Sequence, residues 1–293
     1  GEVLAGTARA LGLEVKLTTV ASASEMSELG LSLALLDVST LPFTGEFGRL
    51  TPETAEAAAV SAESAARLVL EGDCAALVTA PLTKEGLALA GRDFPGHTEM
   101  LARICGRTGS ELMLMVGGGL RVALVTTHLA IADVPGTLSA ELIFARLRTL
   151  FSGLRTDLGV DEPRVAVLAL NPHAGEGGRF GGEETAVIAP AISRARAQGM
   201  RAEGPLPADT AFHRALSGEF DAVVAMYHDQ GLAVLKTLAF DSGVNVTLGL
   251  PLVRTSPDHG TAYDIAGTGR ASERSTVEAV NLARAIANRR NNR

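Results

Sequence analysis

Cysteine is scarce in this sequence. The 293 residues include two cysteines, Cys74 and Cys105, which do not form a CxxC pair. This excludes a disulfide framework and a cysteine-based zinc knuckle. The first residues, 1 to 17, mix acidic and basic side chains and lack the basic-then-apolar pattern of a signal peptide. We therefore expect reduced thiols in a cytoplasmic protein.

Long apolar runs, positive charge and the common nucleotide-binding motifs are also missing. No run approaches the roughly 18 apolar residues of a membrane span, so a membrane is not expected as a partner. The formal net charge of −7 disfavours nucleic acid. No GxxxxGK[ST] motif occurs, and the GEGGRFG stretch at 175–181 does not fit the Rossmann fingerprint. A nucleotide cofactor must therefore be held in another way.

Lysine is nearly absent, because arginine fills 23 of the 26 basic positions. In such a background a remaining lysine indicates a need for a compact amine whose pKa shifts readily. Lys84 stands at the end of an apolar run, in TAPLTKEG, and Lys236 stands in HDQGLAVLK. Both are candidate functional residues, whereas Lys16 is interpreted as an exposed residue.

Short apolar runs alternate with helical periods along the chain. The helix expected at 51–72 has a Thr N-cap, a Pro at its first position and a closing Gly. Runs that are apolar on both faces and alternate with helices favour an α/β fold with a largely parallel sheet. We expect strands at 75–80, 112–116, 121–127, 164–170 and 221–226, and further helices at 137–152, 183–198 and 273–289.

Three of the six histidines follow predicted strands: His128, His173 and His228. The carboxyl ends of parallel strands meet at one edge of a sheet, so these imidazoles should point toward a common region. Three neutral imidazoles with an open fourth position are typical of a catalytic zinc site, which Asp209 and Asp229 could complete or orient. The alternative is that each histidine is a hydrogen-bonded loop residue.

A second group of residues has the chemistry of an anion site. Lys236, Asn245 and Arg254 can together hold a phosphate or a carboxylate, although a solvated surface position is the alternative for each. In FPGHTEML, His97 and Thr98 precede an apolar helical pattern, where free backbone N–H groups favour an anion. Simple capping of that helix by Thr98 explains the same pattern.

At these residues the chain resembles the 4-hydroxythreonine-4-phosphate dehydrogenase (PdxA) family of pyridoxal phosphate biosynthesis. The matching blocks extend from about residue 75 to residue 270 and are TAPLTKEG, FPGHTEM, RVALVTTHLA, LNPHAGEGGRFGGEE, GPLPADT, AMYHDQGLAVLK, GVNVTLGLPLVRTSPDHGTA and DIAGTGRA. One departure is that the strand and Gly-rich loop reading close to GDPAGIGPE, with which family members begin, does not occur before Gly1.

For the architecture, the resemblance implies two α/β/α domains with a mostly parallel sheet, like isocitrate and isopropylmalate dehydrogenases, with the active site in the cleft between them. Residues 1–96 with 256–293 would form the first domain. Residues 97–255 would form the second and carry the metal and the dimer interface. The resemblance also implies a homodimer whose active site lies at that interface.

For the chemistry, the resemblance implies that NAD or NADP oxidises 4-phosphohydroxy-L-threonine to 2-amino-3-oxo-4-phosphooxybutanoate, which decarboxylates to 3-amino-2-oxopropyl phosphate. It also implies one divalent metal per subunit, zinc or else magnesium or cobalt. The implied metal ligands are His128, His173 and His228. The implied substrate-binding residues are His97, Thr98, Lys236, Asn245 and Arg254, and the catalytic candidates are Lys236 and Asp209.

Two kinds of rival function stay open. Relatives within the family act on 4-phosphothreonate, 4-phosphoerythronate or a cyclic dihydrodiol, and the quoted motifs do not separate a substrate amino group from a hydroxyl. A metal-dependent lyase or epimerase would use the same three histidines without nicotinamide. Reduction of a nicotinamide cofactor by the purified protein would exclude the second kind.

Overall fold

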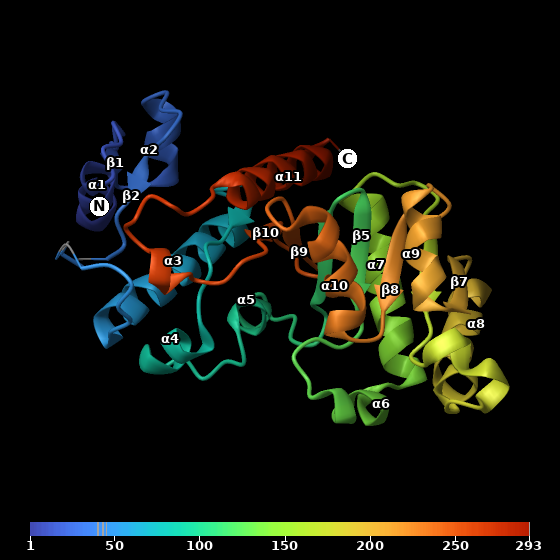
Figure 1. Cartoon of the computed structure of the whole chain (residues 1–293). Helices are drawn as coiled ribbons and strands as arrows, with labels where there is room; N and C mark the ends of the chain where they lie inside the picture. Colours follow the sequence, from blue (N-terminus) through green and yellow to red (C-terminus); the bar gives the residue numbers. More distant parts are fainter. Residues whose placement is uncertain (40, 43, 45, 293) are drawn as a thin grey trace.

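An eight-stranded mixed sheet forms the centre of the molecule, with the strand order β3-β10-β9-β4-β5-β8-β6-β7 (Figure 1). The computed structural model describes residues 1–39, 41–42, 44 and 46–292. The strands are β3 (Leu77–Val78), β4 (Leu112–Gly117), β5 (Leu120–Leu124), β6 (Arg164–Leu168), β7 (Arg201–Leu206), β8 (Ala222–Ala225), β9 (Val244–Leu248) and β10 (Arg254–Pro257).

The strand directions divide this sheet into regions. The pairs β5–β8, β8–β6 and β6–β7 are parallel, and so is β3–β10. Between these two groups, β9 is antiparallel to both of its neighbours and β4 forms an antiparallel hairpin with β5. The prediction of an α/β fold with a mostly parallel sheet is confirmed, and the antiparallel pairs lie in the middle of the sheet.

Helices cover both faces of the sheet. The longer ones are α3 (Pro52–Glu71), α7 (Ala140–Thr156), α8 (Ala189–Ala197), α9 (Ala208–Leu216), α10 (His228–Ala239) and α11 (Arg274–Asn291), and the shorter ones are α4 (Lys84–Leu89), α5 (His97–Ile104) and α6 (Val134–Thr137). One face shares a core with α7, α8 and α11, and the other shares a core with α9 and α10. The helices expected at 137–152, 183–198 and 273–289 are present, although the second begins as a π-helical turn at Glu184–Ile188.

Alternation along β9 determines which side chains face the site. Val244, Val246 and Leu248 point into the core under α7 and α11. Successive side chains of a strand point to opposite faces, so Asn245 and Thr247 point to the other face. Polar residues of this strand are therefore placed together on the side away from α7.

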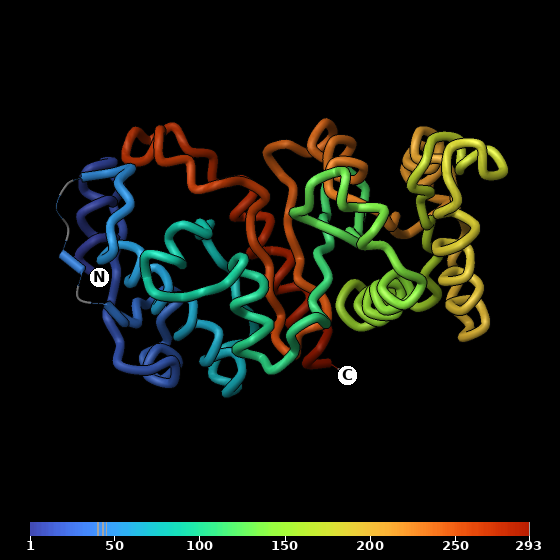
Figure 2. The backbone as a smooth tube through the Cα atoms, turned by 90° about the horizontal axis from the view of Figure 1, so that it is seen from below, coloured from blue at the N-terminus to red at the C-terminus, as the bar shows by residue number. Residues whose placement is uncertain are grey.

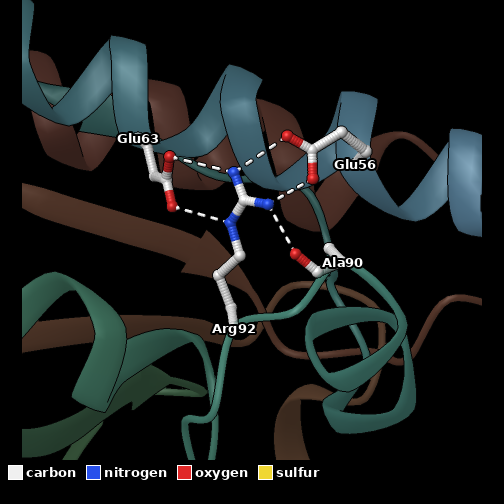
Figure 3. A network of polar contacts seen from close by, with 4 residues as sticks. All are labelled: Glu56, Glu63, Ala90 and Arg92. Atoms are coloured by element: carbon white, nitrogen blue, oxygen red, sulfur yellow. Dashed lines mark hydrogen bonds and ion pairs between the residues drawn. The ribbon is translucent and has the colours of Figure 1, made fainter.

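A third apolar cluster lies under α3, which begins and ends as expected. Thr51 caps its first turn, and Gly72 closes it with a left-handed φ of 89°. Arg92, which follows α4, binds two carboxylates on α3 (Figure 3). Its Nε donates to Glu63 at 3.1 Å and its Nη2 donates to Glu56 at 3.0 Å, so one side chain joins α4 to α3.

The first part of the chain forms a small unit beside α3. It contains α1 (Glu2–Ala10), α2 (Ala23–Glu28) and a parallel pair of strands, β1 (Thr19–Val20) and β2 (Leu35–Leu36). Seen from below, this unit lies at one end of an elongated molecule and α8 lies at the other (Figure 2). The division into residues 1–96 with 256–293 and residues 97–255 stays a prediction, and the eight-stranded sheet contains strands from both parts.

The sequence predicts neither a disulfide framework nor a membrane-spanning helix. Cys74 and Cys105 are both free and half-buried. Burial raises the pKa of each thiol, so both are unreactive at neutral pH. Within the described ranges, every helix is too short or too polar to cross a bilayer.

Candidate active site

The three adjacent strands β5, β8 and β6 end at one edge of the sheet, and hydrogen bonds join their ends. Thr126 Oγ1 donates to the carbonyl oxygen of Met226 at 2.7 Å. The backbone N–H of Met226 donates to Oε1 of Gln230 at 2.7 Å, and Nε2 of Gln230 donates to the carbonyl oxygen of Ala169 at 2.7 Å. The segments that carry the three predicted imidazoles therefore begin at one edge of the sheet, where hydrogen bonds join the strand ends.

His128 and His228 lie side by side at this edge, with ring centroids 5.7 Å apart. His228 is the first residue of α10, and its Nδ1 lies 2.6 Å from a carboxylate oxygen of Asp229. A carboxylate that holds Nδ1 fixes the ring and leaves Nε2 available, an arrangement found around metal-binding histidines. Both histidines line a cavity of about 250 Å³. This donor set suits a divalent metal such as zinc.

His173 stands apart from this pair. It is exposed on the loop after β6. Across the residues that the structure describes, no three His, Cys, Asp or Glu side chains converge on one metal position. Asp209, the predicted neighbour of the metal, is exposed in the first turn of α9. The structure thus brings together two of the three predicted ligands within one chain.

The loop that carries His173 has an uncommon backbone. Five consecutive residues, 173 to 177, are left-handed, and three of them are not glycine: His173, Ala174 and Glu176, with φ of 51°, 54° and 42°. A left-handed conformation costs about 1–2 kcal/mol for each such residue. Strained runs of this kind persist only where the surroundings hold them, and they concentrate at functional sites.

Arg254 forms the other end of the site, as a buried cation on β10. Its side chain is 4% exposed and donates to the hydroxyl groups of Thr79, at 2.9 and 3.1 Å, and Thr247, at 3.0 Å. Nη1 also lies 3.5 Å from Oγ1 of Thr98. Burial lowers the pKa of Arg254 to about 10, although Glu99 acts in the opposite direction.

The Arg254 guanidinium has hydroxyl partners and no counter-ion. No carboxylate in the described part of the chain lies within 4.0 Å of it. A buried cation without a paired anion is unfavourable, and a phosphate or carboxylate that accepts two parallel N–H bonds is the anion that matches its geometry. The arrangement therefore suits an anionic ligand.

His97 lies beside Arg254 at the beginning of α5. Burial, and secondarily the charge of Arg254, lower the pKa of His97 to about 3, so its ring is neutral at neutral pH. Its Nε2 is buried without a hydrogen-bond partner. The N-cap of α5 is Gly96, so Thr98 does not cap this helix and its hydroxyl group is free to face Arg254.

One cavity of about 780 Å³ is lined both by His128 and by His97 and Thr98, the neighbours of Arg254. Its volume is within the usual range of small-molecule sites. The polar residues that line it include Lys84, His97, Thr98, Thr126, His128 and Arg146. Lys84, one of the two candidate lysines, is exposed at the first position of α4.

Lys236 and Asn245 are placed differently from the other predicted substrate residues. Lys236 lies in the last turn of α10, and its Nζ is 3.3 Å from a carboxylate oxygen of Asp258. Asn245 is on β9, two residues before Thr247, and its Oδ1 is buried without a partner. The structure therefore groups His97, Thr98 and Arg254 closely, and it shows Lys236 bound to an acidic side chain.

Sequence reasoning missed three residues of this site. The sequence could have indicated Thr247, because the pattern VNVTL places it on the same strand face as Asn245. Thr79 ends an apolar run, and nothing local indicates that it contacts Arg254, which lies 175 positions later. Gln230 follows His228 by two residues, and its role depends on a strand that is distant in sequence.

Comparison with known proteins gives consistent matches. Residues 1–283 match the family model described as pyridoxal phosphate biosynthetic protein PdxA. The chain is 47% identical over 277 residues to 4-hydroxythreonine-4-phosphate dehydrogenase of Trichlorobacter lovleyi, which covers 93% of this chain and 82% of that protein. It is 45% identical over 298 residues to a candidate D-threonate 4-phosphate dehydrogenase of Bradyrhizobium diazoefficiens, which covers 98% of this chain and 85% of that protein. The crystal structure of 4-hydroxythreonine-4-phosphate dehydrogenase from Klebsiella pneumoniae has a TM-score of 0.82 at 39% identity, covering 95% of this chain and 86% of that chain.

Proposed function

The chain belongs to the PdxA family of pyridoxal phosphate biosynthetic proteins, and we propose that it is a dehydrogenase that oxidises 4-phosphohydroxy-L-threonine with NAD or NADP. The product, 2-amino-3-oxo-4-phosphooxybutanoate, is a β-keto acid that decarboxylates to 3-amino-2-oxopropyl phosphate. The observation that carries the proposal is the buried Arg254, which has hydroxyl partners and no ion pair, and whose neighbour Thr98 lines a cavity that His128 also lines.

The anionic part of the substrate is proposed to bind at Arg254. Thr98 and the first turn of α5 supply donors next to the guanidinium, and the positive end of a helix favours an anion there. The unpartnered Nε2 of His97 adds one hydrogen-bonding atom that a phosphate oxygen or hydroxyl group can reach. Asn245 and Lys236 are proposed to complete the set.

A divalent metal is proposed on His128, His173 and His228. When bound, such a metal polarises the substrate hydroxyl group, and the nicotinamide accepts the hydride. His128 and His228 support this, because they are neighbours and Asp229 orients His228. His173 is exposed, and no three ligating side chains converge within the described part of one chain, so we propose that two copies of the chain contribute to each metal, in a homodimer.

Proton transfer is assigned to Lys236, with Asp209 as a second candidate. Lys236 Nζ lies 3.3 Å from a carboxylate oxygen of Asp258, which fixes the position of the amine. In the proposal, loss of carbon dioxide from the β-keto acid leaves an enolate, and Lys236 delivers the proton to its carbon. A Lys236→Arg variant keeps the charge and loses the titratable amine, so near-normal turnover in that variant would remove this role.

The test of the proposed function is a spectrophotometric assay of the purified protein. We expect reduced nicotinamide to accumulate with 4-phosphohydroxy-L-threonine, at a rate that falls sharply in His173→Ala. Turnover without nicotinamide reduction would support the lyase or epimerase alternative. Unchanged activity and metal content in His173→Ala would refute the three-histidine site.

The proposed sharing of the metal between two chains has its own test. Inactive His173→Ala protein is mixed with inactive His128→Ala protein, and in a second mixture with inactive His228→Ala protein, under conditions that exchange subunits. If one chain supplies His128 and His228 and the other supplies His173, both mixtures contain hybrid dimers with one intact site and regain activity. If both mixtures stay inactive although mass measurements show hybrids, the sharing is refuted.

A second candidate substrate is D-threonate 4-phosphate. The similarity to the Bradyrhizobium diazoefficiens protein favours it, because the match covers 85% of that relative, against 82% of the Trichlorobacter lovleyi 4-hydroxythreonine-4-phosphate dehydrogenase. The two substrates differ by an amino group in place of a hydroxyl group. The ratio of their kcat/KM values decides between them.

A further inference from the structure

We propose that Glu184 is a positioning residue, whose buried carboxylate holds the left-handed loop so that His173 is presented for metal binding. The proposal rests on the proposed function of His173. Glu184 does not touch the substrate or the metal in this account. It acts through the backbone of the segment between β6 and α8.

Glu184 accepts hydrogen bonds from the residues at which this loop begins. Its side chain is 5% exposed. Oε1 accepts from the backbone N–H of Leu170 at 3.0 Å and of Asn171 at 2.8 Å. Oε2 accepts from Nδ2 of Asn171 at 3.1 Å. A single carboxylate therefore joins the two ends of the segment that carries His173.

The same carboxylate packs against the left-handed turn itself. A Cβ atom built on Gly175 would lie 2.7 Å from Oε2 of Glu184, closer than atoms of this kind approach. Gly175 has a φ of 79°, so it is left-handed as well as in tight contact. A side chain at this position would displace the Glu184 carboxylate from its hydrogen bonds, so the turn and the carboxylate constrain each other.

A second carboxylate reinforces the attachment at Asn171. Oε2 of Glu183 accepts from Nδ2 of Asn171 at 2.8 Å. A Cβ atom at Gly181 would lie 2.7 Å from that nitrogen, so the returning end of the loop also passes close to Asn171. Asn171 thus receives contacts from both sides of the loop, two residues before His173.

The ionisation of Glu184 strengthens the hydrogen bonds by which its carboxylate holds the loop. Burial acts to raise the pKa of Glu184, but the hydrogen bonds from Asn171 and Leu170 outweigh it and hold the pKa below its usual value. The carboxylate is therefore ionised at neutral pH. Charge-assisted hydrogen bonds from N–H donors are stronger than neutral ones.

The backbone around Glu184 points to a positioning role beyond ordinary loop packing. Glu184 begins a π-helical turn, Glu184–Ile188, at the start of a segment whose sequence predicts an ordinary helix. Single π-turns inside helices occur frequently at functional sites. Here the π-turn and the strained residues 173–177 are joined by the Glu184 carboxylate. Hydrogen bonds that orient a metal-binding side chain, made by groups that do not touch the metal, commonly affect metal affinity.

The test compares Glu184→Ala and Glu184→Gln with a matched control, Asp157→Asn. Asp157 is another buried carboxylate, 4% exposed, which accepts two hydrogen bonds from Arg290 at the end of α7. The measured quantities are the Zn²⁺ dissociation constant, by competition with a chromophoric chelator, the amide hydrogen exchange of residues 173–178, and the thermal midpoint without metal.

We expect Glu184→Ala to weaken Zn²⁺ binding about 10–100-fold and to speed exchange at residues 173–178. Glu184→Gln keeps one acceptor oxygen and should fall between Glu184→Ala and the unmodified protein, which also keeps the test valid if Glu184→Ala does not fold. Asp157→Asn should lower the thermal midpoint and leave the Zn²⁺ dissociation constant unchanged.

Two results would overturn the inference. The first is unchanged Zn²⁺ affinity in both Glu184 variants. The second is an equal loss of affinity in Asp157→Asn, which would show a general effect of lost stability. The His173→Ala variant separates failure of this inference from failure of the proposed function. If His173→Ala weakens Zn²⁺ binding and the Glu184 variants do not, the metal site is supported and only the role of Glu184 is wrong. If His173→Ala binds Zn²⁺ normally, both are wrong.

Discussion

The hydroxyl oxygen of Thr79 accepts hydrogen bonds from both Nε and Nη2 of Arg254, at 3.1 and 2.9 Å. The two residues meet because β3 and β10 are paired neighbours in the sheet. A hydroxyl group satisfies N–H donors and leaves the positive charge in place. Arg254 is therefore fixed in position by neutral groups, and the charge of Glu99 acts on it only from beyond ion-pair distance.

Replacement of Arg254 by methionine should separate stability from binding. Removing a buried cation that lacks a paired anion is expected to leave the thermal midpoint of the unliganded protein unchanged or higher. The KM for a phosphorylated substrate should rise about 10–100-fold, which corresponds to the loss of charged hydrogen bonds. Inorganic phosphate should raise the thermal midpoint of the unmodified protein and have a smaller effect on the variant. Arg284→Met, an exposed position on α11, is the control. A large fall in the midpoint of Arg254→Met alone would contradict the account.

His97 should make stability depend on pH in acid. Its pKa is lowered from 6.5 in the unfolded chain to about 3 in the folded protein. Between these values the unfolded state binds more protons, so the free energy of unfolding falls as the pH is lowered from 6.5, by up to ~1.4 kcal/mol per pH unit from this group. Above pH 6.5 both states are neutral and the contribution vanishes. Urea unfolding of His97→Gln should show a shallower loss of stability in this window, and identical slopes would refute the assignment.

The hydrogen bonds of Gln230 should matter for stability. Gln230→Met keeps the size of the side chain and leaves the N–H of Met226 and the carbonyl oxygen of Ala169 without partners. We expect a loss of about 1–3 kcal/mol in the free energy of unfolding. Gln198→Met, at the exposed end of α8, should change it by less than about 0.5 kcal/mol. Equal effects of the two substitutions in urea titrations would show that the strand ends do not depend on Gln230.

The end of α11 should depend on Arg290. Its Nε and Nη2 donate to the two carboxylate oxygens of Asp157 at 2.8 Å each, and Nη1 donates to the carbonyl oxygen of Pro251 at 2.9 Å. Arg290→Leu leaves a buried carboxylate unpaired and should lower the free energy of unfolding by about 3 kcal/mol. The double variant Arg290→Leu/Asp157→Leu should recover part of this loss. No recovery would indicate that the loss in Arg290→Leu does not come from the unpaired Asp157 carboxylate.

Features that depend on a few neighbouring residues can be predicted from the sequence. The helix α3 has Thr51 as its cap and Gly72 as its end, and both were recognised from composition. The placement of His128, His173 and His228 after three strands that end at one edge followed from apolar runs and the geometry of parallel sheets. These inferences need only a short window of sequence and one topological rule.

Other features depend on partners that are distant in sequence. The left-handed run from His173 to Gly177 contains three residues that do not favour this conformation, so local propensity opposes what the structure adopts. Glu184, at the beginning of an apparently ordinary helical period, accepts from Asn171 and does not function as a surface residue. In the same way, the contact of Thr79 with Arg254 requires the strand order, which the sequence did not predict.

The direction of β10 decides which of its ends lies at the edge with the candidate site. Because β9 is parallel in direction to β5 and antiparallel to β10, the beginning of β10 lies at the same edge as the carboxyl ends of β5 and β8. Arg254 is the first residue of β10. In an all-parallel sheet, a residue that opens a strand would lie on the edge opposite the catalytic one. Because β10 runs opposite to β5, an amino-terminal strand position lies at the same edge as His128 and His228.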